Sequence, residues 1–254
     1  MTIAIGVLCT DGVVIGADSS ATFGPHITQP TIEQKTQKVH VLHNRFVVTS
    51  TGAIGANQRF LDGLDKAWVG NKFNGAHTAI EYGRRLCATG KDDFAATKMD
   101  HMQYGALVAF PVKRELHLVE LALFDFQPEL KTPKMWFCCM GSGQKIADPF
   151  FGMMRRVFYP KSQPTLKEGL FMTTWALMHA IELNTGGIDG PPQLATLSLN
   201  EKGESTAQIL TEDDVEEHKG SAVAAERHLS CYREILNNPA PAAAGGEIPG
   251  PAAT

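Results

Sequence analysis

The sequence predicts an α+β fold in which two β-sheets are sandwiched between layers of helices. Apolar runs typical of strands and segments with helical periodicity follow one another in the order strands, two helices, strands, two helices, strands, helix. No internal repeat and no linker interrupts residues 1–236, so we expect one domain over residues 2–236. Proline, glycine and alanine dominate residues 237–254, which have little to bury and are predicted to be a disordered tail.

The first fifty residues are rich in strands. Apolar runs at residues 3–8 and 13–17 flank Asp11-Gly12, a dipeptide that favours a tight hairpin. Residues 39–42 and 46–50 predict a second pair of strands. The polar stretch between the two pairs, residues 23–37, contains prolines and predicts an irregular loop.

Helical periodicity begins after Gly52. Apolar residues recur at spacings of three and four over residues 60–68, and a second helix is expected over residues 77–88. Thr165 and Glu168 form a capping-box pattern, in which each side chain can satisfy a free amide at the start of a helix. The other strands and helices are predicted over residues 104–110, 115–123, 135–140, 165–183, 194–199, 207–210 and 211–236.

The composition excludes several classes of protein. The chain has 254 residues, with 23 Lys and Arg against 27 Asp and Glu, and it has no basic stripe that could neutralise nucleic-acid phosphates. Its apolar runs are shorter than the roughly 18–20 residues that span a bilayer. The N-terminus lacks the basic region of a signal peptide, and the five cysteines suit a reducing compartment. We therefore expect a cytoplasmic protein without nucleic-acid or membrane partners.

Familiar cofactor and metal motifs are missing, so neither a cofactor nor a metal is expected. The sequence has no Walker loop, no HExxH and no paired CxxC. Cys138 and Cys139 are adjacent in a predicted strand, so they point to opposite faces and cannot chelate one ion together. A Cys–His hydrolase built on Cys9 is conceivable, although its sequence neighbours do not resemble an activating environment.

Thr2 directly follows the initiator methionine, and its small side chain permits removal of Met1. An N-terminal threonine combines a nucleophile and a base, because its α-amine, with a reference pKa of about 7.7–8.0, can take the hydroxyl proton at neutral pH. Most chains that begin Met-Thr are not enzymes. Thr2 alone therefore does not indicate an enzyme, and other residues of the chain must support a catalytic role.

Further residues complete such a pattern. Thr2 opens a strand, Asp18 closes the next strand, Lys38 begins a third, and Gly52 lies at a strand-to-helix junction. In these features the chain resembles the proteasome β-subunit and HslV family of N-terminal-nucleophile hydrolases. The matching stretches are Thr2-Ile3-Ala4-Ile5-Gly6, Asp11-Gly12-Val13-Val14-Ile15-Gly16-Ala17-Asp18, Ala21-Thr22, Lys38-Val39, Gly52-Ala53-Ile54-Gly55-Ala56-Asn57-Gln58, Gly141-Ser142-Gly143 and Thr185-Gly186-Gly187. The resemblance covers roughly residues 2–210 and implies a four-layer αββα sandwich of two antiparallel sheets.

The resemblance also implies a role for each matching residue. Thr2 would be the nucleophile and its own amine the general base. Lys38 would favour the alkoxide and the neutral amine, and Asp18 would hold the lysine ammonium in place. The backbone N–H of Gly52 would bind the tetrahedral oxyanion, and Ser142 would support the Thr2 amine by a hydrogen bond.

Structural interpretations remain open for three of these residues. Lys38 could be a solvated lysine close to Lys35, Gly52 a helix-entry glycine, and Ser142 part of a simple Gly-Ser-Gly turn.

Four more residues are expected from the resemblance to bind substrate. Thr22 would hold the substrate backbone as an added strand, and Ala21, Ser50 and Ile54 would line the first specificity pocket.

The chain departs from the family pattern at Glu182. The family places a carboxylate, normally Asp, three residues before a Ser/Thr-Gly-Gly turn, and here Glu182 precedes Thr185. Both residues are expected to be part of the catalytic group. The substitution of Glu for Asp favours a divergent member, such as one of the less common bacterial proteasome homologues.

The function predicted from this resemblance is that of a threonine endopeptidase. Identical subunits would assemble into a ring, expected to be a double ring, and hydrolyse unfolded peptides inside its chamber, with an ATPase regulator as a possible partner. One alternative is a ring whose chemistry has decayed and which serves as a scaffold or binding chamber. Another is an N-terminal-nucleophile amidohydrolase that acts on a small molecule.

Overall fold

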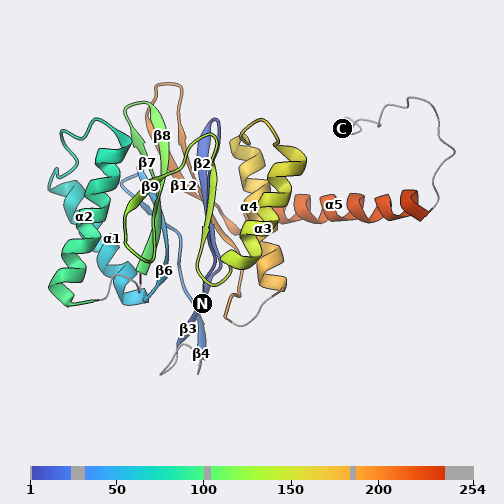
Figure 1. Ribbon diagram of the computed structural model, residues 1–254, viewed down its shortest axis with the longest axis horizontal. Coiled ribbons are helices and arrows are strands. Elements are labelled where there is room, and N and C mark those ends of the chain that lie inside the picture. Colours follow the sequence, from blue (N-terminus) through green and yellow to red (C-terminus); the bar gives the residue numbers. More distant parts are fainter. Residues whose placement is uncertain (1, 24–31, 100–103, 184–186, 238–254) are drawn as a thin grey trace.

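The computed structural model describes residues 2–23, 32–99, 104–183 and 187–237. In these ranges the chain forms four layers, in which two five-stranded antiparallel sheets lie face to face between helices (Figure 1). The predicted α+β sandwich is confirmed. None of the helices in these ranges is long and apolar enough to cross a membrane.

The first sheet carries the N-terminus and has the strand order β10-β1-β2-β11-β12. Its strands are β1 (Ala4–Leu8), β2 (Gly12–Ala17), β10 (Phe137–Met140), β11 (Gln193–Leu199) and β12 (Ser205–Ile209). Ala17 pairs with Ala4 on one side and with Gln193 on the other, so β1 and β11 begin where β2 ends. Helices α3 (Gln144–Phe158) and α4 (Leu166–Glu182) cover the outer face of this sheet (Figure 1).

The second sheet has the order β5-β6-β7-β8-β9. Its strands are β5 (His40–Leu42), β6 (Phe46–Gly52), β7 (Tyr104–Val112), β8 (Glu115–Leu121) and β9 (Pro128–Leu130). Helices α1 (Ile54–Val69) and α2 (Ala79–Thr97) cover its outer face (Figure 1). α2 begins with a complete capping box between Thr78 and Glu81.

Two hydrophobic clusters hold the layers together. The larger one fills the space between the sheets and the space under α3 and α4, with Ile3, Ile5 and Ile15 fully buried. The second is aromatic and lies between the second sheet and helices α1 and α2. Its members include Phe46, Phe60, Tyr104, Phe110 and Phe126. Burial of this apolar surface on both faces of each sheet is the main force that stabilises the layers.

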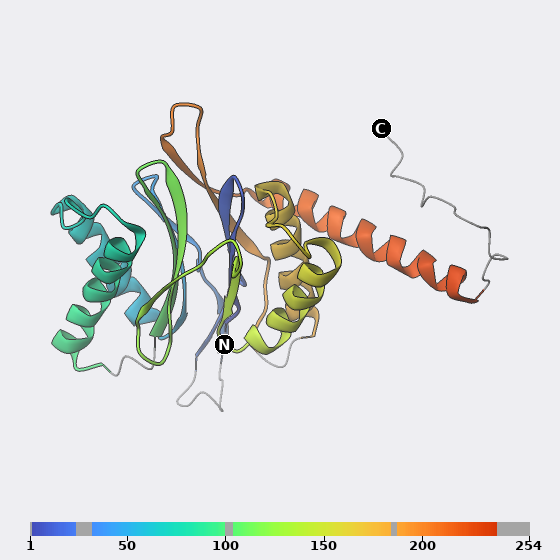
Figure 2. The same cartoon turned by 45° about the horizontal axis from the view of Figure 1, so that its top comes forward.

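Helix α5 (Glu212–Asn237) extends beyond the sandwich. Its first half packs on α4, where Val215 and Ala222 are buried and the indole Nε1 of Trp175 donates a hydrogen bond to Glu226 at 2.8 Å. Beyond that contact the helix projects away from the four layers (Figures 1 and 2). Asn237, predicted to begin the tail, is the last residue of this helix, and the rest of the predicted tail lies outside the described residues.

The structure corrects the loop predicted over residues 23–37. Strand β4 (Ile32–Lys35) lies inside that stretch and pairs with β3 (Ser20–Phe23) in a two-stranded hairpin. All four residues of β4 are exposed, so the strand lacks the alternation of apolar and polar residues that a sequence reveals. Residues 24–31 of the predicted loop lie outside the described residues.

Helix α2 is longer than predicted, because it runs to Thr97 instead of residue 88. The second half of α2 contains many polar residues and Gly90, so its sequence has no clear helical periodicity. In the structure Phe94 is buried there, and the Phe126 ring fills the space beside Gly90. Tertiary packing therefore outweighs the weak local propensity.

Candidate active site

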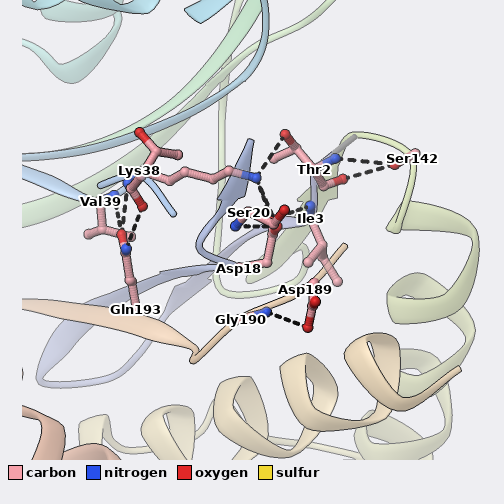
Figure 3. Close-up of polar contacts among 11 residues, drawn as sticks. Thr2, Ile3, Asp18, Ser20, Lys38, Val39, Ser142, Asp189, Gly190 and Gln193 are labelled. Atoms are coloured by element: carbon pink, nitrogen blue, oxygen red, sulfur yellow. Dashed lines mark hydrogen bonds and ion pairs between the residues drawn. The ribbon is translucent and has the colours of Figure 1, made fainter. Parts of the chain in front are cut away.

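Thr2, Asp18 and Lys38 meet at one end of the sandwich (Figure 3). The ammonium Nζ of Lys38 lies 2.8 Å from each carboxylate oxygen of Asp18 and 3.3 Å from the Thr2 hydroxyl oxygen. All three residues are buried. Thr2 lies just before β1, Asp18 directly follows β2 and Lys38 lies just before β5, so the fold brings together residues that are far apart in the chain.

The backbone at the β1–β2 pair holds the Asp18 carboxylate in place. One carboxylate oxygen accepts a hydrogen bond from the amide of Ile3 at 3.0 Å, and the other accepts from the amide of Ser20 at 3.2 Å. The Asp18 amide in turn donates to the carbonyl of Ile3 at 3.3 Å. A fully buried carboxylate is tolerated only when such partners compensate for lost water, and here two amides and an ammonium do so.

The environment of Lys38 suits a group that must stabilise charge on a neighbouring hydroxyl. Burial lowers the pKa of Lys38 from its ordinary value, while the Asp18 carboxylate, through its charge and its hydrogen bond, and more weakly Glu33 oppose that shift. The ammonium is therefore fixed by Asp18 on one side and is directed at the Thr2 hydroxyl on the other.

A turn after β10 surrounds the backbone of Thr2. The Thr2 nitrogen donates to the Ser142 hydroxyl oxygen at 3.2 Å, and the amide of Gly143 donates to the Thr2 carbonyl at 3.2 Å. Gly141 has a positive φ of 88°, and a Cβ at this position would collide with the Thr2 carbonyl. Glycine at 141 thus permits Ser142 to approach the Thr2 nitrogen.

Gly52 lies at the junction of β6 and α1, with a positive φ of 110° and an exposed backbone. The preceding residue, Thr51, approaches Gly141, which in turn contacts Thr2, so the end of β6 adjoins the Thr2 turn. The following helix α1 directs its N-terminus to this place, where the helix dipole favours negative charge. This position is compatible with binding of an oxyanion by the Gly52 amide.

The residues expected to bind substrate lie on β3, β6 and α1. Ala21 is buried on β3, and Thr22 pairs with Glu33 of β4. Ser50 and Ile54 are half-buried, at the end of β6 and the start of α1.

A hydrogen-bond chain that the sequence did not reveal begins at Ser50. Ser50 hydrogen-bonds the phenol of Tyr104, which donates to Asn57 at 3.2 Å. The side-chain amide of Asn57 donates to the ring Nε2 of His40 at 3.4 Å. Burial lowers the pKa of His40, consistent with a neutral ring that accepts this bond.

Comparison with known proteins gives the family. The sequence model of the proteasome subunit family matches residues 2–189, which is more than half of the chain. The chain belongs to the proteasome subunit family. Among curated proteins there is no significant match.

Solved structures similar to this proteasome-family chain include three of Anbu. The Gly-1 mutant of Anbu from Hyphomicrobium sp. strain MC1 is 15% identical, with a TM-score of 0.71 over 92% of this chain and 97% of that chain. A second structure of Anbu from the same strain is 16% identical, with a TM-score of 0.68 over 91% and 97%. Anbu from Yersinia bercovieri, described as an ancestral beta-subunit, is 15% identical, with a TM-score of 0.67 over 99% and 100%. At 15–16% sequence identity, the similarity to these structures shows a shared fold alone.

Two further residues, Glu182 and Thr185, were predicted to belong to this site. Glu182 is the last residue of α4 and is exposed, and Thr185 lies outside the described residues. The catalytic role of both residues stays a prediction.

The cysteine alternatives gain no support from the structure. Cys9 is buried, and burial together with the charges of Asp11 and Glu168 raises the pKa of its thiol. A thiol held in its protonated form is a poor nucleophile. Cys138 and Cys139 are also buried with raised thiol pKa values, and the described part of the chain contains no group of three metal-ligating side chains.

Proposed function

We propose that this proteasome-family chain is the threonine endopeptidase subunit of a self-compartmentalising ring. The observation that carries the proposal is the alignment of a hydroxyl, an ammonium and a carboxylate, Thr2–Lys38–Asp18, with the Thr2 nitrogen on Ser142. After removal of Met1 this arrangement would contain the parts that acyl transfer requires, namely a nucleophile, an adjacent base and a group that stabilises charge.

In the proposed reaction, removal of Met1 converts the Thr2 nitrogen into an amine. The amine takes the proton from the Thr2 hydroxyl, and the oxygen attacks the peptide carbonyl while Lys38 stabilises its negative charge. The tetrahedral oxyanion is bound by the Gly52 amide. Collapse breaks the C–N bond, the leaving amine takes the proton from the Thr2 ammonium, and an ester remains on Thr2. Water, deprotonated by the free amine, then hydrolyses this ester and restores the hydroxyl.

Assembly into a ring of identical subunits is part of the proposal. Subunits of the proteasome family form oligomeric rings. Leu229, Tyr232 and Leu236 recur at spacings of three and four on the projecting half of α5 and are 60%, 57% and 67% exposed. An apolar stripe of this kind is typical of a helix that packs against another surface, and a second subunit would cover it. We further propose a double ring, a cytoplasmic location and an ATPase regulator, by resemblance to the family.

The decayed-ring alternative is supported by one observation, the exposure of Glu182 at the place where the family normally has Asp. If Glu182 does not contact the Thr2 amine, the amine is held less firmly and turnover falls. The scaffold alternative therefore predicts an assembled ring without peptidase activity.

The test combines an intact mass with peptide hydrolysis. The mass must show loss of Met1, and the purified protein must hydrolyse fluorogenic peptides. Thr2→Ala is expected to lower turnover by several orders of magnitude, because only binding and oxyanion stabilisation remain. Thr206→Ala, at an exposed threonine of β12, is the matched control and should keep full turnover.

Four outcomes contradict the endopeptidase proposal. If Met1 is retained, the Thr2 nitrogen is not an amine and cannot act as the base. If Thr2→Ala keeps its turnover, the Thr2 hydroxyl is not the nucleophile. An assembled wild-type ring that lacks Met1 and hydrolyses no peptide favours the scaffold. A small oligomer that hydrolyses only small amides favours the amidohydrolase.

A further inference from the structure

The segment that contains Lys38 belongs to neither of the five-stranded sheets. Residues 36–39 connect β4 to β5 and are neither helix nor strand. Nevertheless Lys38 must keep its ammonium within hydrogen-bond distance of Asp18 and Thr2, which flank strands β2 and β1 of the first sheet. Something other than strand pairing must therefore fix the backbone of this segment.

One side chain of the first sheet binds this segment at three points. The side-chain carbonyl of Gln193 accepts hydrogen bonds from the amides of Lys38 at 2.7 Å and Val39 at 3.2 Å (Figure 3). The side-chain NH2 of Gln193 donates to the carbonyl of Thr36 at 2.8 Å. The primary amide thus replaces a neighbouring strand, because it satisfies two donors and one acceptor of the segment at once.

The backbone of Gln193 is tied to the strand that carries Asp18. Gln193 is the first residue of β11 and pairs with Ala17, which directly precedes Asp18. The residue after Asp18 also contributes, because the carbonyl of Ser19 accepts a hydrogen bond from the amide of Thr36 at 2.9 Å. The separation between the Lys38 backbone and the Asp18 carboxylate is therefore set by the β2–β11 pair and the Gln193 side chain.

We propose that Gln193 is a positioning residue for the reaction at Thr2, in that its amide clamps residues 36–39 and so holds Lys38 on Asp18 and the Thr2 hydroxyl. The inference deepens the proposed function and rests on it. Glutamine is required because methionine has a similar length but makes none of the three bonds. A carboxylate could accept from the two amides but would repel the carbonyl of Thr36.

The test uses Gln193→Met in the full-length assembled protein, with Gln208→Met as the matched control. Gln208 is an exposed glutamine on β12, far along the sheet from Asp18. The number of reactive Thr2 hydroxyls is first counted with a peptide electrophile, so that turnover is expressed per competent site. We expect kcat of Gln193→Met to fall about 10- to 100-fold, the range for a misplaced catalytic group, with KM nearly unchanged. Gln193→Glu, which keeps two of the three bonds, should lie between this variant and the wild type.

A second measurement does not depend on activity. Acylation of Lys38 by an amine-reactive ester is followed by mass spectrometry, with the exposed Lys202 as the internal reference. In the wild type Lys38 is buried against Asp18 and should react slowly. In Gln193→Met its rate relative to Lys202 should rise at least threefold, and in Gln208→Met it should stay the same.

The two measurements separate the possible failures. Faster labelling of Lys38 with a lower kcat supports the proposal. Unchanged labelling overturns it, whether or not the protein hydrolyses peptides, and so does faster labelling with unchanged kcat. A wild type without peptidase activity in which the variant still exposes Lys38 overturns the proposed function and leaves the clamp established.

Discussion

Replacement of Asp18 by Asn tests whether the Asp18–Lys38 pair organises the site. The wild-type carboxylate is fully buried and accepts from two backbone amides and the lysine ammonium. In Asp18→Asn, the side-chain NH2 takes the place of one carboxylate oxygen. Each oxygen accepts from a backbone amide and from Lys38, so in either orientation the NH2 faces donors and Lys38 loses its carboxylate partner. Removal of one partner from a buried ion pair costs about 3–5 kcal/mol, so we expect the free energy of unfolding to fall by about that amount.

The pH dependence of this loss has a definite sign. Without Asp18, burial lowers the pKa of Lys38 further, because the main opposing cause is gone. A folded-state pKa below the unfolded value of about 10.4 means that stability increases as pH rises and the lysine becomes neutral. The deficit of Asp18→Asn relative to the wild type should therefore shrink between about pH 7 and pH 10.

Urea unfolding at a fixed subunit concentration measures both effects. The double variant Asp18→Asn/Lys38→Met is the control, because it removes the buried charge together with its partner and should recover part of the lost stability. A loss below about 1 kcal/mol at pH 7, or a deficit that grows with pH, would refute the reasoning.

Three further predictions concern other parts of the molecule. Because burial lowers the pKa of His40, the folded state favours the neutral ring, so the free energy of unfolding should fall from pH 7 to pH 5, and His40→Asn should reduce that fall in urea titrations. Glu182→Gln should lower peptide turnover if the carboxylate supports the Thr2 amine, and full turnover in this variant would show an uninvolved surface residue. Leu229→Lys combined with Tyr232→Lys should reduce the size of the assembly in light scattering without changing the circular dichroism of the subunit.

The sequence predicted the elements that have a strong hydrophobic pattern. β1, β2 and α4 were predicted within one or two residues, because buried runs and a capping box mark them in the chain. β4 was missed because backbone pairing with β3, and no buried side chain, holds it in place. The local sequence pattern indicates which side chains are buried, so it does not predict a strand whose side chains are all exposed.

The same contrast applies to the site. Thr2, Asp18, Lys38 and Ser142 could be predicted because a known pattern of residue types connects them. Gln193 carries no such signal, since its amide acts only on the backbone of a segment more than 150 positions away. The hydrogen-bond chain from Ser50 to His40 could not be predicted from the sequence either, because its partners come within hydrogen-bond distance only when α1 packs on the second sheet.

Removal of Met1 decides whether this geometry can act. While Met1 is attached, the Thr2 nitrogen is an amide and has no basicity, although it already donates to Ser142 at 3.2 Å. Cleavage changes the chemistry of that atom without requiring a movement of Thr2, because the Gly143 amide and the β1–β2 pair hold the residue through its carbonyl and the following amide. The hydroxyl already lies 3.3 Å from the Lys38 ammonium while Met1 is attached. The proposed function uses this preorganisation, because a single proteolytic step with no refolding would then convert a buried threonine into a nucleophile with its own base.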